Sequence, residues 1–191
     1  MRSITLVFAE LLKHFIPEQS GDVHAATPDR MRAAWEHLTS GYKLDPNEVF
    51  KIFDEADCDE MIFQGNIPIY SMCEHHGAPF FGIAHVGYIP TRGKIIGLSK
   101  IPRLLDIYSR RFSIQERITR QTAEAMNYNL KPKGVGVVLQ CRHLCMESRG
   151  VQKPGTITIT SSLRGCIKDE PEARAEFLQF VHVASSGLKP I

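Results

Sequence analysis

The sequence contains no apolar run close to the ~20 residues that a membrane-spanning helix needs. The apolar residues 4–9 are followed by Glu10 and Lys13 and by no small-residue cleavage site, so we expect no signal peptide. An excess of one charge is also missing, because 23 basic and 21 acidic residues leave a net charge of +2. Without a basic tail or stripe, the sequence indicates neither nucleic acid nor a membrane as a partner.

The chain also lacks the even set of cysteines that a disulfide framework would need. Its five cysteines favour a reducing compartment, so we expect a cytoplasmic protein. Cys58, Cys141 and Cys166 show no clustering with other metal-binding residue types and are interpreted as ordinary thiols. A length of 191 residues suits one domain with a sizeable core, and the 43% of hydrophobic residues is ordinary for a globular chain.

Apolar spacing divides the chain into helices and strands without an internal repeat. Helical periodicity predicts helices over residues 3–16, 27–41, 47–53, 99–112, 113–130 and 171–184. Strand-like patterns cover residues 60–72, 79–89, 134–145 and 156–163. This order favours an α+β domain with an antiparallel sheet.

Polar residues predict where two of these helices begin. Thr27 is suited to cap the second helix, with Pro28 at its first position. Ser113 and Glu116 have the spacing of a capping box at the start of the helix over 113–130. The last helix is expected to bury Phe177, Leu178 and Val181.

The residue types that carry the most chemistry gather in two places, Cys73-Glu74-His75-His76 and, much later, His143-Leu144-Cys145. Thiolate and imidazole are ligands that zinc prefers, and a catalytic zinc site has three protein ligands and one open position. Cys73, His75, His76 and Cys145 are therefore candidate ligands, with His143 as a fifth. The ordinary alternative, core cysteines with scattered histidines, is not excluded by the spacing alone.

Strand geometry sorts these candidates in part. Residues two apart on an extended segment point the same way, so His143 and Cys145 could face one site. His75 and His76 are adjacent and would point to opposite sides, so we expect only one of them to be a ligand. The other would lie beside the metal as a proton carrier, a role that suits a side chain with a near-neutral pKa.

Several separated motifs carry a resemblance to a known family. They are Ser71-Met72-Cys73-Glu74-His75-His76, Tyr88-Ile89-Pro90, Gly97-Leu98-Ser99-Lys100, Gln115-Glu116-Arg117 and His143-Leu144-Cys145-Met146 with Arg149-Gly150-Val151. Together, in this order, they closely resemble the GTP cyclohydrolase I family, whose members convert GTP to 7,8-dihydroneopterin triphosphate and formate. The resemblance extends from about residue 26 to the end of the sequence.

The resemblance implies a role for each of these site residues. It makes Cys73, His76 and Cys145 the zinc ligands. It places the proton-handling histidines at His75 and His143, and Ser99 in the rearrangement of the ribose. For the substrate, it implies guanine recognition by Glu116 with a further polar contact from Gln115, and triphosphate binding by Lys100, Arg103, Arg149 and Arg30. Other basic residues, such as Arg117, are expected to lie on a solvated basic face.

The family also implies a fold and an assembly. The fold is the tunnelling fold, an α+β arrangement with an antiparallel sheet and helices packed on one face, preceded here by N-terminal helices. We expect a helical region over residues 1–58 and a catalytic region over 59–191. Family members form a toroidal homodecamer of two pentameric rings, with active sites between subunits.

Two departures from the family pattern and two rival functions remain open. Gln140-Cys141 stands where the family usually has an acidic residue and alanine, which would weaken any effect of that carboxylate on a nearby histidine. Glu147-Ser148 also differs in detail from many relatives. The rivals are a catalytically silent homologue and a related tunnelling-fold enzyme such as a nitrile reductase, which uses NADPH and a nucleophilic cysteine without zinc.

Overall fold

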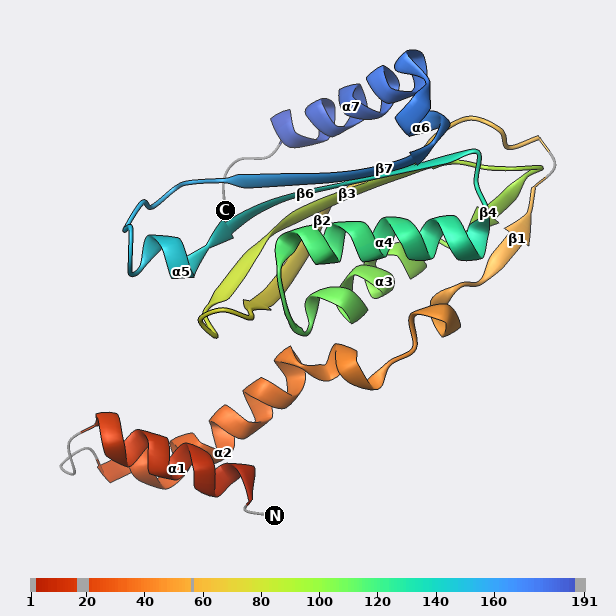
Figure 1. Cartoon of the computed structure of the whole chain (residues 1–191). Helices are drawn as coiled ribbons and strands as arrows, with labels where there is room; N and C mark the ends of the chain where they lie inside the picture. Colours follow the sequence, from red (N-terminus) through yellow and green to blue (C-terminus); the bar gives the residue numbers. More distant parts are fainter. Residues whose placement is uncertain (1–2, 17–20, 56, 188–191) are drawn as a thin grey trace.

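The computed structural model describes residues 3–16, 21–55 and 57–187. Its centre is a curled five-stranded sheet in the order β5-β2-β3-β6-β7 (Figure 1). Four long strands, β2 (Ile62–Cys73), β3 (Pro79–Ile89), β6 (Gly134–His143) and β7 (Thr158–Gly165), pair antiparallel. The α+β class is therefore confirmed.

The prediction of a purely antiparallel sheet is wrong at one edge. The short strand β5 (Phe112–Ser113) runs parallel to the end of β2, where Met72 pairs with Phe112 and Cys73 with Ser113. The two residues of β5 link two helices. They lie along the free edge of β2 and run in the same direction as β2. The connection therefore brings the start of the following helix next to Cys73.

Helices cover both faces of the sheet, whereas the sequence predicted one covered face (Figure 1). Helices α3 (Lys100–Ser109) and α4 (Gln115–Leu130) lie on one face, and α6 (Cys166–Asp169) and α7 (Pro171–Ser186) lie on the other. Alternate residues of β6 explain the difference, because side chains on a strand point to opposite faces in turn. Val137 and Leu139 pack in the cluster with α3 and α4, while Val138 packs with Phe177 of α7.

Helix α7 buries fewer of its apolar side chains than its sequence predicted. Phe177 is fully buried, but the neighbouring Leu178 is 46% exposed, so its predicted burial is wrong. Successive residues of a helix are about 100° apart, and only one of the two can face the sheet. Glycines in the strands make room for the Phe177 ring, since a Cβ on Gly136 would lie 2.8 Å from it.

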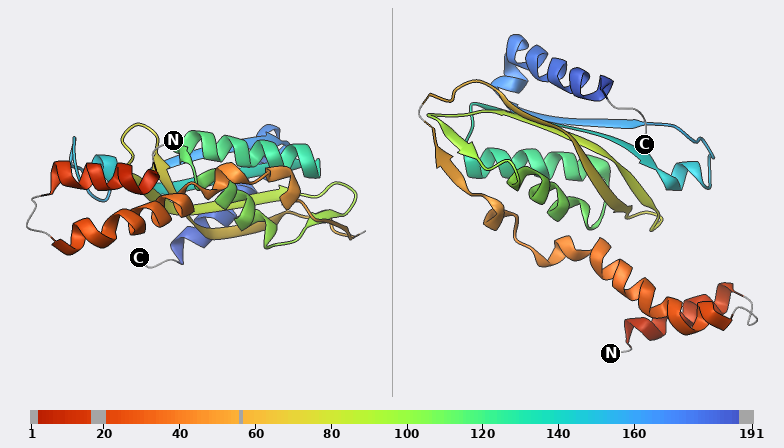
Figure 2. Two further views of the ribbon diagram at one scale, coloured as in Figure 1. Left: turned by 90° about the horizontal axis from the view of Figure 1, so that it is seen from below. Right: turned by 180° about the vertical axis from the view of Figure 1, so that it is seen from behind.

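The N-terminal part forms a helical hairpin of α1 (Ile4–Phe15) and α2 (Gly21–Leu38), which projects from the rest of the molecule (Figures 1 and 2). Helix α2 begins earlier than predicted, so Pro28 lies inside it and Thr27 is not its cap. Along the described chain, no helix combines the length and apolarity required to cross a membrane.

Two short 3-10 helices, η1 (Ser40–Lys43) and η2 (Pro46–Val49), connect the hairpin to the sheet domain. Strand β1 (Ile52–Asp54) follows and pairs antiparallel with β4 (Lys94–Ile96). The predicted helix over 47–53 is therefore wrong. Pro46 and the capping side chain of Asp45 support only one tight turn, after which the chain extends.

Candidate active site

The described residues contain one group of three side chains that could hold a metal ion, Cys73, His76 and Cys145. One ligand atom from each lies within 4.8 Å of the others. Cys73 ends β2, His76 lies in the turn that leads to β3, and Cys145 lies on the short helix α5 (Leu144–Glu147) after β6. The three meet because β3 is hydrogen-bonded to both β2 and β6. This is the set that the family resemblance implies.

The local backbone differs from the strand geometry used to sort the candidates. Residues 74–76 form a turn, and β6 ends at His143, so the predicted strand over 134–145 is too long and Cys145 is helical. Both adjacent histidines line the same cavity, so the expected orientation to opposite sides is not what separates them. His76 joins the three-residue group, while the Nδ1 atom of His75 lies 3.7 Å from the Cys73 sulfur.

A cavity of about 310 Å³ opens beside this group. Its volume lies at the lower end of the range for small-molecule sites. Its walls bring together the two sequence segments that carry the candidate ligands and the start of α4. The lining residues are Cys73, His75, His76, Phe80, Ser113, Ile114, Gln115, Glu116, His143, Cys145, Met146 and Thr158.

His143 is held at the cavity wall by two neighbours. Its ring stacks on Phe80 with centroids 4.6 Å apart, and its Nε2 atom lies 2.9 Å from Oε1 of Gln115. Since an amide oxygen can only accept, Nε2 carries the proton and the neutral ring leaves Nδ1 as its free acceptor. Burial lowers the pKa of His143, and the negative charge of Glu116 opposes that shift. The ring is therefore largely neutral at neutral pH.

Gln115 is buried and bonded inside the protein. Its amide nitrogen lies within hydrogen-bond distance of the Leu139 carbonyl at 3.1 Å, the Thr158 carbonyl at 3.0 Å and Oγ1 of Thr160 at 3.1 Å. With Oε1 accepting from His143, the side chain ties α4 to β6, β7 and the histidine. A contact of Gln115 with substrate stays a prediction, and its positioning of His143 was not foreseen.

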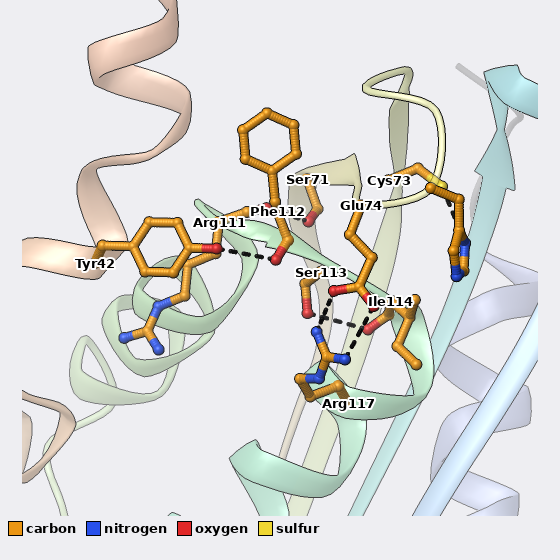
Figure 3. Close-up of polar contacts among 10 residues, drawn as sticks. Tyr42, Ser71, Cys73, Glu74, Arg111, Phe112, Ser113, Ile114 and Arg117 are labelled. Atoms are coloured by element: carbon orange, nitrogen blue, oxygen red, sulfur yellow. Dashed lines mark hydrogen bonds and ion pairs between the residues drawn. The ribbon is translucent and has the colours of Figure 1, made fainter.

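Glu116 is exposed at the cavity and is not part of a capping box. The residue preceding α4 is Ile114, and no side chain caps the helix. The Ser113 hydroxyl instead donates to the carbonyl of Ile114 (Figure 3). The capping interpretation of Ser113 and Glu116 is therefore wrong, and the Glu116 carboxylate is left at the cavity.

Comparison with known proteins decides the family. The family model described as GTP cyclohydrolase I matches residues 4–182. The chain belongs to the GTP cyclohydrolase I family. A protein of Nitrosospira multiformis named GTP cyclohydrolase 1 is 50% identical over 154 residues, which cover 80% of each chain. One of Leptospira biflexa with the same name is 46% identical over 178 residues, covering 92% of this chain and 96% of the other.

A solved structure shows a weaker likeness. The apo form of an archaeosine synthase QueF-Like is 16% identical to this member of the GTP cyclohydrolase I family. The match covers 58% of this chain and 97% of that chain, with a TM-score of 0.45. This likeness is too low to support any argument about the site.

Some site residues implied by the GTP cyclohydrolase I family lie outside the cavity beside Cys73. Lys100 and Arg103 line a second cavity of about 330 Å³, between α3 and the turns η1 and η2. Ser99 is exposed at the residue before α3, and Arg30 is exposed on α2. Arg149 is exposed after α5, where its positive charge opposes the raised pKa of Cys145.

The donor set fits a soft divalent metal. Burial and the nearby Cys73 sulfur raise the pKa of the Cys145 thiol. Loss of both thiol protons is therefore unfavourable unless a cation is bound. A bound divalent metal would reverse that preference. Two sulfurs and one imidazole nitrogen favour zinc over magnesium or calcium, which prefer oxygen ligands.

The side chain of Gln140, where the sequence departs from the family pattern, points away from this site. Its amide nitrogen donates to the Ser185 hydroxyl of α7 at 3.0 Å, on the opposite face of the sheet from α4. His143 is instead held by α4 through Gln115. The neutral side chain at position 140 therefore has no direct effect on the histidine.

Two ion pairs beside the candidate ligands were not foreseen. Arg117, expected on a solvated basic face, forms a bidentate pair with Glu74 (Figure 3), and Arg142 forms another with Glu147. Arg142 and Glu147 are only five residues apart, but Glu74 and Arg117 are 43 apart, and their positions in the sequence give no signal for a pair. Only the fold brings that pair together.

Proposed function

We propose that this chain is a GTP cyclohydrolase I. It hydrolytically opens the imidazole ring of guanine in GTP, releases formate and forms 7,8-dihydroneopterin 3'-triphosphate. Membership of the GTP cyclohydrolase I family supports the proposal. The observation that carries it to this chain is one cavity that contains the Cys73, His76 and Cys145 group together with His143, whose ring is oriented by Gln115.

The proposed cofactor is zinc, held by Cys73, His76 and Cys145. Their side chains supply the sulfur and nitrogen donors of a three-ligand catalytic site. When bound, zinc makes water available as a nucleophile at neutral pH by lowering its pKa from ~15.7 toward ~7. The remaining chemistry falls to side chains of the protein.

His143 and His75 are the proposed proton carriers. Nδ1 of the neutral His143 ring can take up a proton and pass it to N7 of guanine, while Gln115 keeps Nε2 protonated and the ring oriented. Protonation at N7 makes C8 open to attack by water and lets the ring open to a formamide. His75 lies in the same cavity and can assist the second hydrolysis that releases formate. Ser99 is proposed to act in the later ribose rearrangement.

Glu116 is proposed to recognise guanine. A carboxylate can accept hydrogen bonds from N1–H and the exocyclic amine of guanine, and adenine presents no such pair of donors. A site built around these hydrogen bonds rejects a base that lacks them by a large factor. The exposure of Glu116 at the cavity, without a capping role, supports this assignment.

Lys100, Arg103, Arg149 and Arg30 are proposed to bind the triphosphate. Lysine supplies a point charge and arginine a bidentate fork. Lys100 and Arg103 lie on α3 and line a different cavity from the metal group, which supports completion of each site by a neighbouring copy.

A toroidal homodecamer of tunnelling-fold subunits in the cytoplasm is the proposed assembly. Within the described residues β7 pairs only with β6, and Ile159 on this edge strand is 63% exposed. An open edge with exposed apolar side chains favours pairing with another chain. We also propose a division into an N-terminal helical region (1–58) and a catalytic region (59–191).

The deciding experiment is incubation of the purified protein with GTP and zinc. We expect formate, and a pterin product detected by absorbance or by fluorescence after oxidation, and loss of both with a chelator. His143→Ala should keep the metal and lose turnover. Intact metal without product would favour the silent homologue, and NADPH-dependent nitrile reduction without metal would favour the related reductase.

A further inference from the structure

Two of the three candidate metal ligands, His76 and Cys145, lie on short segments, and the third, Cys73, is the last residue of β2. His76 lies in the turn of residues 74–76, and Cys145 lies on α5, a helix of only four residues. Such short segments have few backbone hydrogen bonds of their own to fix their side chains. Each segment also contains one carboxylate, Glu74 or Glu147, that forms a bidentate pair with an arginine from a longer element.

Glu74 ties the first segment to α4. One carboxylate oxygen accepts from Nη2 of Arg117 at 3.0 Å, and the other accepts from Nη1 (Figure 3). The backbone N–H of Glu74 also donates to the Ser113 carbonyl at 3.1 Å. The turn that carries His76 is thus joined to the beginning of α4, which carries Gln115 and Glu116.

Glu147 ties the second segment to β6. Its carboxylate oxygens accept from Nε of Arg142 at 2.9 Å and from Nη2 at 2.6 Å. The Glu147 side chain is only 6% exposed, and the backbone N–H of Gly155 also donates to it. The Arg142 guanidinium lies 5.8 Å from the centre of the Phe81 ring on β3. These contacts hold both α5 and the loop after it against the sheet.

Neither carboxylate is itself a ligand candidate. Both lie outside the three-residue group, and each has both oxygens bonded to a guanidinium. An isolated surface ion pair contributes little to global stability, but a bidentate pair fixes orientation. The effect of these two pairs should therefore be on the local placement of the ligands.

We infer that Glu74 and Glu147 are positioning residues, which with Arg117 and Arg142 hold the ligand-bearing segments in the geometry that the metal requires. The inference rests on the proposed metal site of the preceding section. Groups hydrogen-bonded to metal ligands change metal affinity by about 10–100-fold when they are removed, and Glu74 and Glu147 act on the same property through the segments that carry the ligands. Metal affinity is thus the property that distinguishes positioning from general stabilisation.

The test compares Glu74→Gln and Glu147→Gln with the parent chain and with Glu124→Gln. Glu124 pairs with Arg120 and Arg164 away from the cavity, so the control removes an ion-paired carboxylate by the same substitution. Zinc affinity is measured by competition with a chromogenic chelator, and the coordination geometry by the absorption spectrum of the Co²⁺ form. We expect about tenfold weaker zinc binding, the lower end of that range, and an altered Co²⁺ spectrum in the two variants, and neither change in the control.

Two further variants keep the inference open to refutation if Glu147→Gln does not fold. Arg142→Lys keeps the charge and loses the fork, so it should weaken zinc binding with the fold intact. The double variant Glu74→Arg with Arg117→Glu exchanges the two charges and should bind zinc more tightly than Glu74→Gln. Parental zinc affinity in the folded variants, or an equal loss in Glu124→Gln, would overturn the inference even if the parent converts GTP. A parent that binds no zinc would instead overturn the metal assignment on which the inference rests.

Discussion

Two adjacent residues at the start of α4 illustrate how differently neighbouring side chains act. Gln115 is 1% exposed and bonded to four groups, whereas Glu116 is exposed at the cavity. Gln115→Ala should lower the free energy of unfolding by about 1–3 kcal/mol, because buried polar partners lose their bonds. Glu116→Gln should change it by less than about 0.5 kcal/mol. Urea unfolding at constant protein concentration measures both.

Glu116 should affect the kinetics far more than it affects stability. Glu116→Gln should lower kcat/KM for GTP by about 100-fold or more, because a neutral amide cannot accept from both guanine donors. Metal content should stay at the parental level, which excludes loss of the metal as the cause. A Glu116→Gln protein with parental kcat/KM would show that guanine is recognised elsewhere.

Burial of His85 should make the stability of the protein depend on pH. Its ring is fully buried and stacked on Phe63, and Nδ1 accepts from the backbone N–H of Asn66 at 3.4 Å. Burial lowers its pKa, and protonation at Nδ1 would remove that acceptor. Between the lowered folded pKa and the unfolded value of ~6.5 only the unfolded chain binds the proton, so stability falls as pH decreases through this window.

Substitution isolates this contribution. His85→Gln should show a smaller loss of stability between pH 7.5 and pH 5 than the parent, with the remaining slope due to other groups such as His143. Unfolding midpoints of the two proteins in urea, measured at the same concentrations across this range, provide the comparison. Identical pH profiles would show that His85 does not titrate differently on folding.

At the scale of elements, helix α7 offers a matched pair of core and surface residues. Phe177 is fully buried against the sheet, and Leu178 is 46% exposed. Phe177→Ala should cost about 3–5 kcal/mol of unfolding free energy, while Leu178→Ala should cost less than about 0.5 kcal/mol. Chemical denaturation of both variants tests the orientation of α7, and a larger loss for Leu178→Ala would contradict it.

The sequence predicts helices and strands well where the local residue pattern determines the structure of the segment. The span of β3 was predicted at its observed bounds, and residues 115–130 were predicted as helix. Predictions failed where distant residues decide. The parallel pairing of β5 needs the edge of β2, and Arg117 pairs with Glu74, 43 residues earlier, instead of lying on a solvated basic face. The ligand group was predicted from the family motif, but the neighbouring pair of Glu74 with Arg117 depends on a contact that no local pattern records.

In the whole molecule, residues that the proposed reaction requires at one site lie beside two different cavities of the same chain. His143 lies in the cavity beside the metal group, while Lys100 and Arg103 line another cavity. In a symmetric ring each copy can offer one surface to one neighbour and the other surface to the next. The proposed site would then combine His143 of one copy with Arg103 of another.

Mixed oligomers test this combination directly. His143→Ala and Arg103→Ala chains should each be nearly inactive alone. Co-expressed in equal amounts and purified through two different tags, they should recover about one quarter of the parental rate of formate release, because random assembly places two intact surfaces together at that frequency. Mixtures of His143→Ala with His75→Ala should recover none, since both histidines belong to the same surface. Mixed oligomers of the first pair that remain inactive would place the complete site within one chain.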